Sequence, residues 1–233
     1  MKTSLIAGIA GLGVGLLLGF FGANSLNRGS QFEATNSSTN APSNPTTVTQ
    51  VGSGDGAMLS GVSEALENAE NEPNNFEAQM TAGEMYSKIG RNDKAIEFFA
   101  KGVAIMPTDF TANIVLANAY FDTKQFDAAE KYYAIALEID PKDVNARTDL
   151  GTTYIERQPP DYRRGIEQFK GVLELDPKHE ATLYNLGVAY FRSGDLDSAK
   201  AALIKLDGAN PGNPLAIRLK ESLSQIAPIR SLP

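Results

Sequence analysis

Between residues 57 and 226, apolar side chains recur at the spacing of amphipathic helices, in short segments separated by polar turns. These segments come in pairs, and a proline follows each pair. The prolines are spaced 34, 34, 36 and 34 residues apart, and they are Pro73, Pro107, Pro141, Pro177 and Pro211. Because proline cannot continue a helix, it forces the chain to turn before the next pair. The pattern predicts an all-α fold, a helical-hairpin solenoid, over residues 57–226.

Within the pairs, a small residue and a larger one recur at fixed spacing. In the first helices they are three residues apart, as in Gly83 and Tyr86, Ala117 and Tyr120, Gly151 and Tyr154, and Gly187 and Tyr190. In the second helices they are four apart, as in Ala95 and Phe99, Ala129 and Tyr133, Gly165 and Phe169, and Ala199 and Leu203. The small residue allows two helices to approach closely, and the larger one fills the space beside it.

This pattern resembles the tetratricopeptide repeat family over residues 76–211. Residues 57–71 are predicted to be the second helix of an incomplete leading unit, and residues 227–233 a tail. The predicted repeats are about 76–109, 110–143, 144–179 and 180–213, followed by a cap helix at 214–226. The third repeat carries two extra residues within 156–165, ERQPPDYRRG, at the turn between its helices. This insertion is either a tolerated loop variant or a bulge presented to a partner.

In that family, the first helix of each repeat lines a concave face, so the resemblance implies a surface that holds peptide segments of partner proteins. Phe121, Ile155 and Phe191 recur in register along it, and Tyr184 lies one turn from Val188. These side chains are either apolar anchors for a partner or packing residues, and both interpretations stay open. The candidate partner-binding residues are Met80, Glu84, Ile114, Asn118, Phe121, Thr148, Thr152, Ile155, Tyr184, Val188 and Phe191.

Residues 1–28 are predicted to be a signal anchor with a transmembrane segment. The stretch 5–23, LIAGIAGLGVGLLLGFFGA, has no charge over 19 residues. As a helix it would span roughly 28 Å, close to the thickness of a bilayer's hydrocarbon core. Its length favours an uncleaved anchor, while a secretory signal cleaved near residues 23–25 is the alternative. Residues 29–56 are rich in Ser, Thr and Asn and are predicted to be a disordered polar linker.

The amino-acid composition excludes most kinds of catalytic and metal-binding chemistry. The chain has no cysteine, which excludes disulfides and thiol catalysis, and its single histidine is too few for a histidine metal site. The net charge of −7 gives little support to nucleic-acid binding. We find no nucleophile–base pair, phosphate loop or metal-ligand cluster, and we therefore predict no enzyme activity, no catalytic residue, no cofactor and no metal. His179 is expected to be a solvent-exposed turn residue.

These features predict a membrane-tethered protein–protein interaction scaffold, single-pass in a bacterial-type inner membrane, with its repeats on the periplasmic side. A c-type cytochrome biogenesis factor that binds apocytochrome is an alternative implied by the resemblance, and a secreted soluble adaptor is another if the signal is cleaved. The partner is expected to be a protein or peptide. A homo-oligomer could form through Gly11, Gly15 and Gly19, or between ends of opposite charge, although both patterns also have ordinary explanations.

Overall fold

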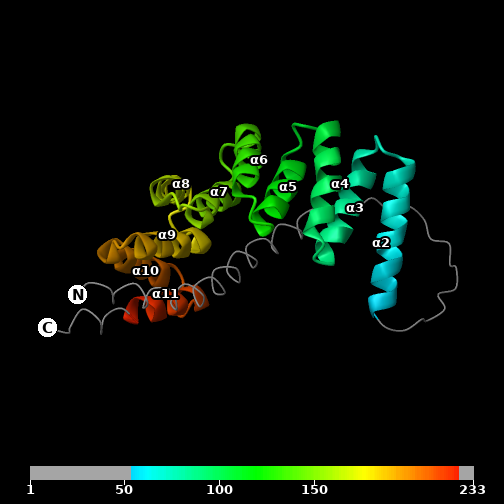
Figure 1. The fold of residues 1–233 in the computed structure, drawn as a ribbon. Helices are drawn as coiled ribbons and strands as arrows, with labels where there is room; N and C mark the ends of the chain where they lie inside the picture. Colours follow the sequence, from blue (N-terminus) through cyan, green and yellow to red (C-terminus); the bar gives the residue numbers. More distant parts are fainter. Residues whose placement is uncertain (1–53, 226–233) are drawn as a thin grey trace, which may run out of the picture. The chain divides into compact units, whose positions relative to one another are not determined.

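The computed structural model describes residues 54–225, which form α-helices joined by short turns, with no strand among these residues (Figure 1). The predicted all-α fold class of helical hairpins is therefore confirmed. The helices are α2 (Gly54–Asn71), α3 (Phe76–Lys88), α4 (Asn92–Ile105), α5 (Phe110–Asp122), α6 (Phe126–Ile139), α7 (Val144–Glu156), α8 (Tyr162–Leu175), α9 (Glu180–Ser193), α10 (Leu196–Ala209) and α11 (Pro214–Ser224).

The predicted anchor 1–28, most of the linker 29–56 and the tail 227–233 lie outside the described residues. Helix α2 begins at Gly54, so the last three residues of the predicted linker are helical. A helix end can extend by such a margin once the helix is packed against a neighbour, as α2 is against α3. Over residues 54–225, none of the helices combines the length and the hydrophobicity that crossing a bilayer requires.

The chain divides into two compact units between Ala146 and Arg147, inside α7. The described part of the first unit, residues 54–146, holds α2 to α6 and the first turn of α7. Here α3 packs on α4, α4 on α5, and α5 on α6. The described part of the second unit, residues 147–225, holds the rest of α7 and α8 to α11. Here α8 and α10 both pack on α9, and α11 covers α9 and α10.

The turn before α7 shows how the repeated Asp-Pro-Lys sequence starts a helix. The carboxylate of Asp140 accepts a hydrogen bond from the backbone N–H of Lys142 at 3.0 Å. Three residues after Asp140, Asp143 accepts one from the backbone N–H of Ala146 at 2.6 Å. A side-chain oxygen at this position satisfies one of the N–H groups that the first helical turn leaves unpaired. The sequence therefore fixes both the end of one helix and the start of the next.

The matching turn before α9 differs at one position. Asp176 accepts a hydrogen bond from the N–H of Lys178 at 3.0 Å, as Asp140 does for Lys142. His179 stands where the other turn has its capping aspartate, and its side chain makes no cap bond to the backbone. Its Nδ1 instead lies 2.7 Å from Oγ1 of Thr182, and the ring is half-buried. His179 lies in the turn before α9, as expected, but its ring is half-buried and not fully exposed, because this contact holds it against α9.

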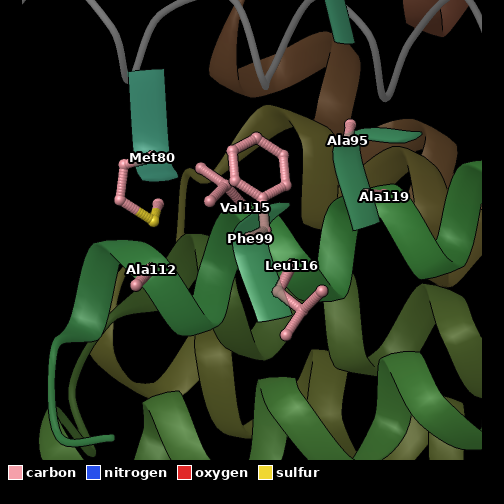
Figure 2. Close-up of a cluster of buried hydrophobic side chains, with 7 residues drawn as sticks. All are labelled: Met80, Ala95, Phe99, Ala112, Val115, Leu116 and Ala119. Atoms are coloured by element: carbon pink, nitrogen blue, oxygen red, sulfur yellow. The ribbon is translucent and has the colours of Figure 1, made fainter. Parts of the chain in front are cut away.

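Apolar side chains from α3, α4 and α5 form a core in the first unit (Figure 2). Gly83 of α3 faces the ring of Phe99 of α4 so closely that an added Cβ would clash with it. The small residue is thus what allows these two helices to pack, as its spacing predicts. The buried cluster consists of Met80, Ala95, Phe99, Ala112, Val115, Leu116 and Ala119.

The second unit repeats this packing with its own glycines. A Cβ at Gly151 of α7 would lie 2.6 Å from Cε1 of Phe169 of α8. At Gly187 of α9 the nearest side chain is Leu219 of α11, which leaves no room for a Cβ. The last helix therefore covers the small residue of α9, and Leu219 itself is 1% exposed. This burial gives α11 the role of a cap on the unit.

Candidate partner-binding surface

The predicted partner-binding residues of the first unit lie on α3 and α5. Glu84 and Asn118 are half-buried. Met80, Ile114 and Phe121 are buried, with exposed fractions of 7%, 4% and 1%. The structure therefore places the two polar members of this group nearer to solvent than the three apolar ones.

Contacts within the unit account for several of these positions. Met80 belongs to the core cluster of Figure 2. Phe121 packs edge-to-face on Phe126, with ring centroids 5.5 Å apart. The amide oxygen of Asn118 accepts a hydrogen bond from the hydroxyl of Tyr133. Of the two interpretations of Phe121, packing is the one for which the structure supplies a contact, and its role in partner binding stays a prediction.

In the second unit, the predicted residues on α7 are all buried. Ile155 is fully buried and points at Gly165 of α8, where an added Cβ would clash with it. Thr148 and Thr152 are also fully buried and form hydrogen bonds to α9. The predicted residues on α9 are exposed by 2%, 1% and 9%, and they are Tyr184, Val188 and Phe191.

Three polar contacts join α7 to α9, and we call them the α7–α9 ladder. The hydroxyl oxygens of Thr148 and Thr182 lie 2.6 Å apart. Asn185 donates from Nδ2 to Oγ1 of Thr152 at 3.1 Å. The third contact is an ion pair between Arg192 and Glu156, whose side chains are 22% and 5% exposed. Because buried polar groups are costly without partners, the ladder favours one register between the two first helices.

Sequence reasoning identified two members of this ladder, Thr148 and Thr152, and missed the others. The available signal was the spacing of Thr148, Thr152 and Glu156, which places three polar residues on one face of a helix. Thr182 and Asn185 could not be paired with them from the sequence. Their hydrogen bonds depend on how far α9 is displaced along α7, which the repeat period alone does not specify.

Tyr184 is a predicted partner-binding residue whose hydroxyl has a shifted pKa. Burial raises the pKa of its hydroxyl above the ordinary tyrosine value of 10.0, while the nearby positive charge of Arg218 lowers it. Because the folded chain disfavours tyrosinate, this group stabilises the fold below about pH 10 and loses that contribution as the pH rises through the raised pKa.

We therefore expect Tyr184→Phe to reduce the alkaline loss of stability. The measurement is the urea midpoint of both chains between about pH 9 and pH 11. The midpoint of the wild type should fall relative to that of Tyr184→Phe as the pH rises. Two curves that stay parallel over this range would contradict the prediction.

The repeat pattern also matches a known family. The family model described as tetratricopeptide repeat matches residues 90–148 and 160–223, which together make up more than half of the chain. The chain belongs to the tetratricopeptide repeat family. No curated protein matches it by sequence. Within residues 54–225, no group of three or more His, Cys, Asp or Glu side chains could hold a metal ion.

Solved structures share the tetratricopeptide repeat fold with this chain. A crystal structure of MamA is 22% identical, with a TM-score of 0.60, over 73% of this chain and 93% of that one. MamA from Desulfovibrio magneticus RS-1 is 20% identical, with a TM-score of 0.60, over 86% and 96%. YrrB, described as a tetratricopeptide repeat protein with an unusual peptide-binding site, is 22% identical, with a TM-score of 0.62, over 72% and 85%. At these identities the likeness establishes the fold alone.

Proposed function

We propose that the chain is a protein–protein interaction scaffold that holds peptide segments of partner proteins against the first helices of its repeats. The α7–α9 ladder carries the proposal. It ties two successive first helices in one register through Thr148 and Thr152, which are fully buried and lie behind the surface that a partner would contact. A surface held in this way is preorganised, which lowers the entropic cost of binding. Membership of the tetratricopeptide repeat family and the peptide-binding site described for YrrB support the same function.

Membrane tethering is the second part of the proposal. It rests on the uncharged stretch 5–23, which is long enough to cross a bilayer as a helix. The scaffold would then work at a bacterial-type inner membrane, with its repeats in the periplasm. The mature N-terminus decides between the two forms, because Met1 is retained by an anchor and removed with a cleaved signal. A mature chain that begins near Leu26 would replace the tether with a secreted adaptor.

The partner surface can be tested with a photo-crosslinking side chain placed at single positions of the full-length protein in its own membranes. Asn118 and Ala181 are half-buried positions on the first helices α5 and α9. Lys131 of α6 and Glu221 of α11 are exposed and serve as matched controls. Because a partner segment would lie along the first helices, we expect crosslinked partner at Asn118 and Ala181 but not at the controls. Equal crosslinking at all four positions would contradict the proposed surface.

A further inference from the structure

An aromatic stack recurs in the first two repeats. In repeat 76–109, Tyr86 of α3 stacks on Phe98 of α4, with ring centroids 5.6 Å apart and planes 14° apart. In repeat 110–143, Tyr120 of α5 stacks on Tyr132 of α6, with centroids 5.6 Å apart and planes 9° apart. Each stack joins a tyrosine of the first helix to an aromatic residue twelve positions later on the second. The repeat thus has a defined place where a second ring lies on this tyrosine.

The third repeat covers the same tyrosine with a cation. Its two extra residues put Gln168 at the equivalent position of α8, so no aromatic partner is available there. The guanidinium carbon of Arg164 lies 3.9 Å from the ring centroid of Tyr154, and Nη2 of Arg164 donates to the Tyr154 hydroxyl at 2.6 Å. A guanidinium over a tyrosine ring is attractive, so this repeat replaces one stacking partner with another.

The fourth repeat has the tyrosine but lacks a stacking partner. Twelve residues after Tyr190 the chain has Ala202, whose side chain cannot stack. Among the described residues, no ring stacks on Tyr190 and no cation lies over it. A cavity of about 370 Å³ opens there instead, between α8, α9 and α10, and we call it the Tyr190 groove. Its lining includes Lys170, Leu173, Leu186, Tyr190, Ala202 and Lys205.

The lining of the Tyr190 groove combines apolar and cationic groups. Leu173, Leu186 and Ala202 supply apolar surface, and Tyr190 is half-buried among them. Lys170 of α8 and Lys205 of α10 are exposed, and with one carboxylate, Glu174, they leave the lining with a net positive charge. The groove is therefore suited to a ligand that joins an apolar planar group to negative charge. None of the predicted first-helix positions lines it, so it is a separate surface.

Charge also distinguishes the two units. The described residues 54–146 contain sixteen acidic and seven basic side chains, whereas residues 147–225 contain eleven of each. An acidic ligand is therefore repelled by the first unit and is not repelled by the second. This difference directs such a ligand towards the unit that holds the Tyr190 groove.

We propose that the Tyr190 groove binds an aromatic side chain from an acidic segment of a partner protein. The ring stacks on Tyr190 in the place that Phe98 and Tyr132 occupy in the first two repeats, and neighbouring carboxylates pair with Lys170 and Lys205. The proposal rests on protein binding as the function, but it assigns a second surface and the chemistry of its ligand. Because none of the predicted partner-binding positions lines the groove, it can fail while the crosslinking at Asn118 and Ala181 succeeds, and the reverse also holds.

The test is a binding titration with a defined probe, an acetylated pentapeptide with one tryptophan between two pairs of acidic residues. The chain contains no tryptophan, so tryptophan fluorescence reports the probe alone. With full-length protein in detergent, we expect saturable binding that weakens as salt is added, because exposed ion pairs are screened. A peptide with alanine for tryptophan gives no signal of its own, so it is added as a competitor, and it should displace the probe poorly. A probe with lysines for the acidic residues should bind poorly. Equal binding of either control probe would overturn the proposal, as would the absence of saturable binding.

A variant that fills the groove gives a sharper test than the control probes. Ala202→Tyr restores the residue type that the second repeat has at this position, so we expect probe affinity to fall by at least about tenfold without a lower melting temperature. Ala104→Tyr, on exposed surface of α4, adds the same side chain elsewhere and should leave affinity unchanged. Unchanged affinity in Ala202→Tyr would overturn the proposal. Occupation of the groove by a second copy of the chain would also overturn the proposal. In that case Ala202→Tyr would change the sedimenting mass of the protein and leave the probe affinity unchanged.

A second variant keeps the test decisive if Ala202→Tyr does not fold. Tyr190→Leu retains an apolar side chain but removes the stacking surface, and we expect it to weaken probe binding by about threefold to tenfold. Lys170→Glu combined with Lys205→Glu should reverse the salt dependence of what binding remains, because the groove then repels the acidic probe and salt screens that repulsion. If Tyr190→Leu binds the probe as the wild type does, stacking on Tyr190 is ruled out and the proposal fails.

Discussion

Replacing Phe169 by alanine should lower the free energy of unfolding by about 3–5 kcal/mol. The ring of Phe169 is fully buried in the second unit, where it lies against Gly151 of α7. Removing it leaves a cavity between α7 and α8, because the glycine opposite has no side chain that could move into the space. The cost therefore combines the lost burial of the ring with the cavity that remains.

Urea denaturation of the full-length chain, followed by circular dichroism, measures this loss. Glu167→Ala on the same helix is the matched control, since Glu167 is exposed and its removal should change stability by no more than about 0.5 kcal/mol. Phe169→Leu keeps most of the volume and should cost less than Phe169→Ala. A loss below about 1 kcal/mol for Phe169→Ala would mean that the ring does not fill the space between the helices.

The fold could be predicted because its determinants are local or periodic. The prolines end helices at fixed intervals, and the small residues mark where one helix crosses another. Gly151 and Phe169 illustrate this, because the sequence pattern names both and the structure brings the ring onto the glycine. The turn before α7 is equally local, since Asp140 and Asp143 bond to backbone groups two and three residues away.

The partner-binding surface was harder to predict because it depends on how far one first helix is displaced along the next. The hydrogen bond from Asn185 to Thr152 joins residues 33 apart, and a shift of one turn along α7 would break it. Burial is a second difficulty. The same row of a first helix contains Phe121, which packs on Phe126, and Asn118, which is half-buried. Periodicity assigns both residues to one row, but it does not say which of them contacts its own chain.

The Tyr190 groove is a further case in which the sequence shows a pattern but not the contact behind it. The tyrosine of every first helix was identified as part of the repeat, but its stacking partner was not. Only the structure shows that Phe98 and Tyr132 stack on Tyr86 and Tyr120, and hence that Ala202 leaves a place unfilled. A departure from a repeat becomes informative once the contact that it removes is known.

Two glycines of α8 should respond with opposite sign to the same substitution. A Cβ at Gly165 would clash with the buried side chain of Ile155 and lie 2.9 Å from the backbone oxygen of Gly151. Because that oxygen belongs to α7 and cannot rotate away, the two helices must separate. We expect Gly165→Ala to cost about 1–3 kcal/mol in spite of the better helix propensity of alanine.

Gly171 supplies the matched control for this prediction. A Cβ there would meet only the side chain of Arg147, with Cδ at 3.6 Å and Nη1 at 3.9 Å, which are ordinary contacts. Gly171→Ala should therefore stabilise the chain, by up to about 1 kcal/mol, because alanine loses less backbone entropy in a helix. The two melting temperatures should move in opposite directions from that of the wild type. A rise in both would show that helix propensity, and not the close crossing of α7 and α8, sets the response at Gly165. A fall in both would contradict the gain expected at Gly171.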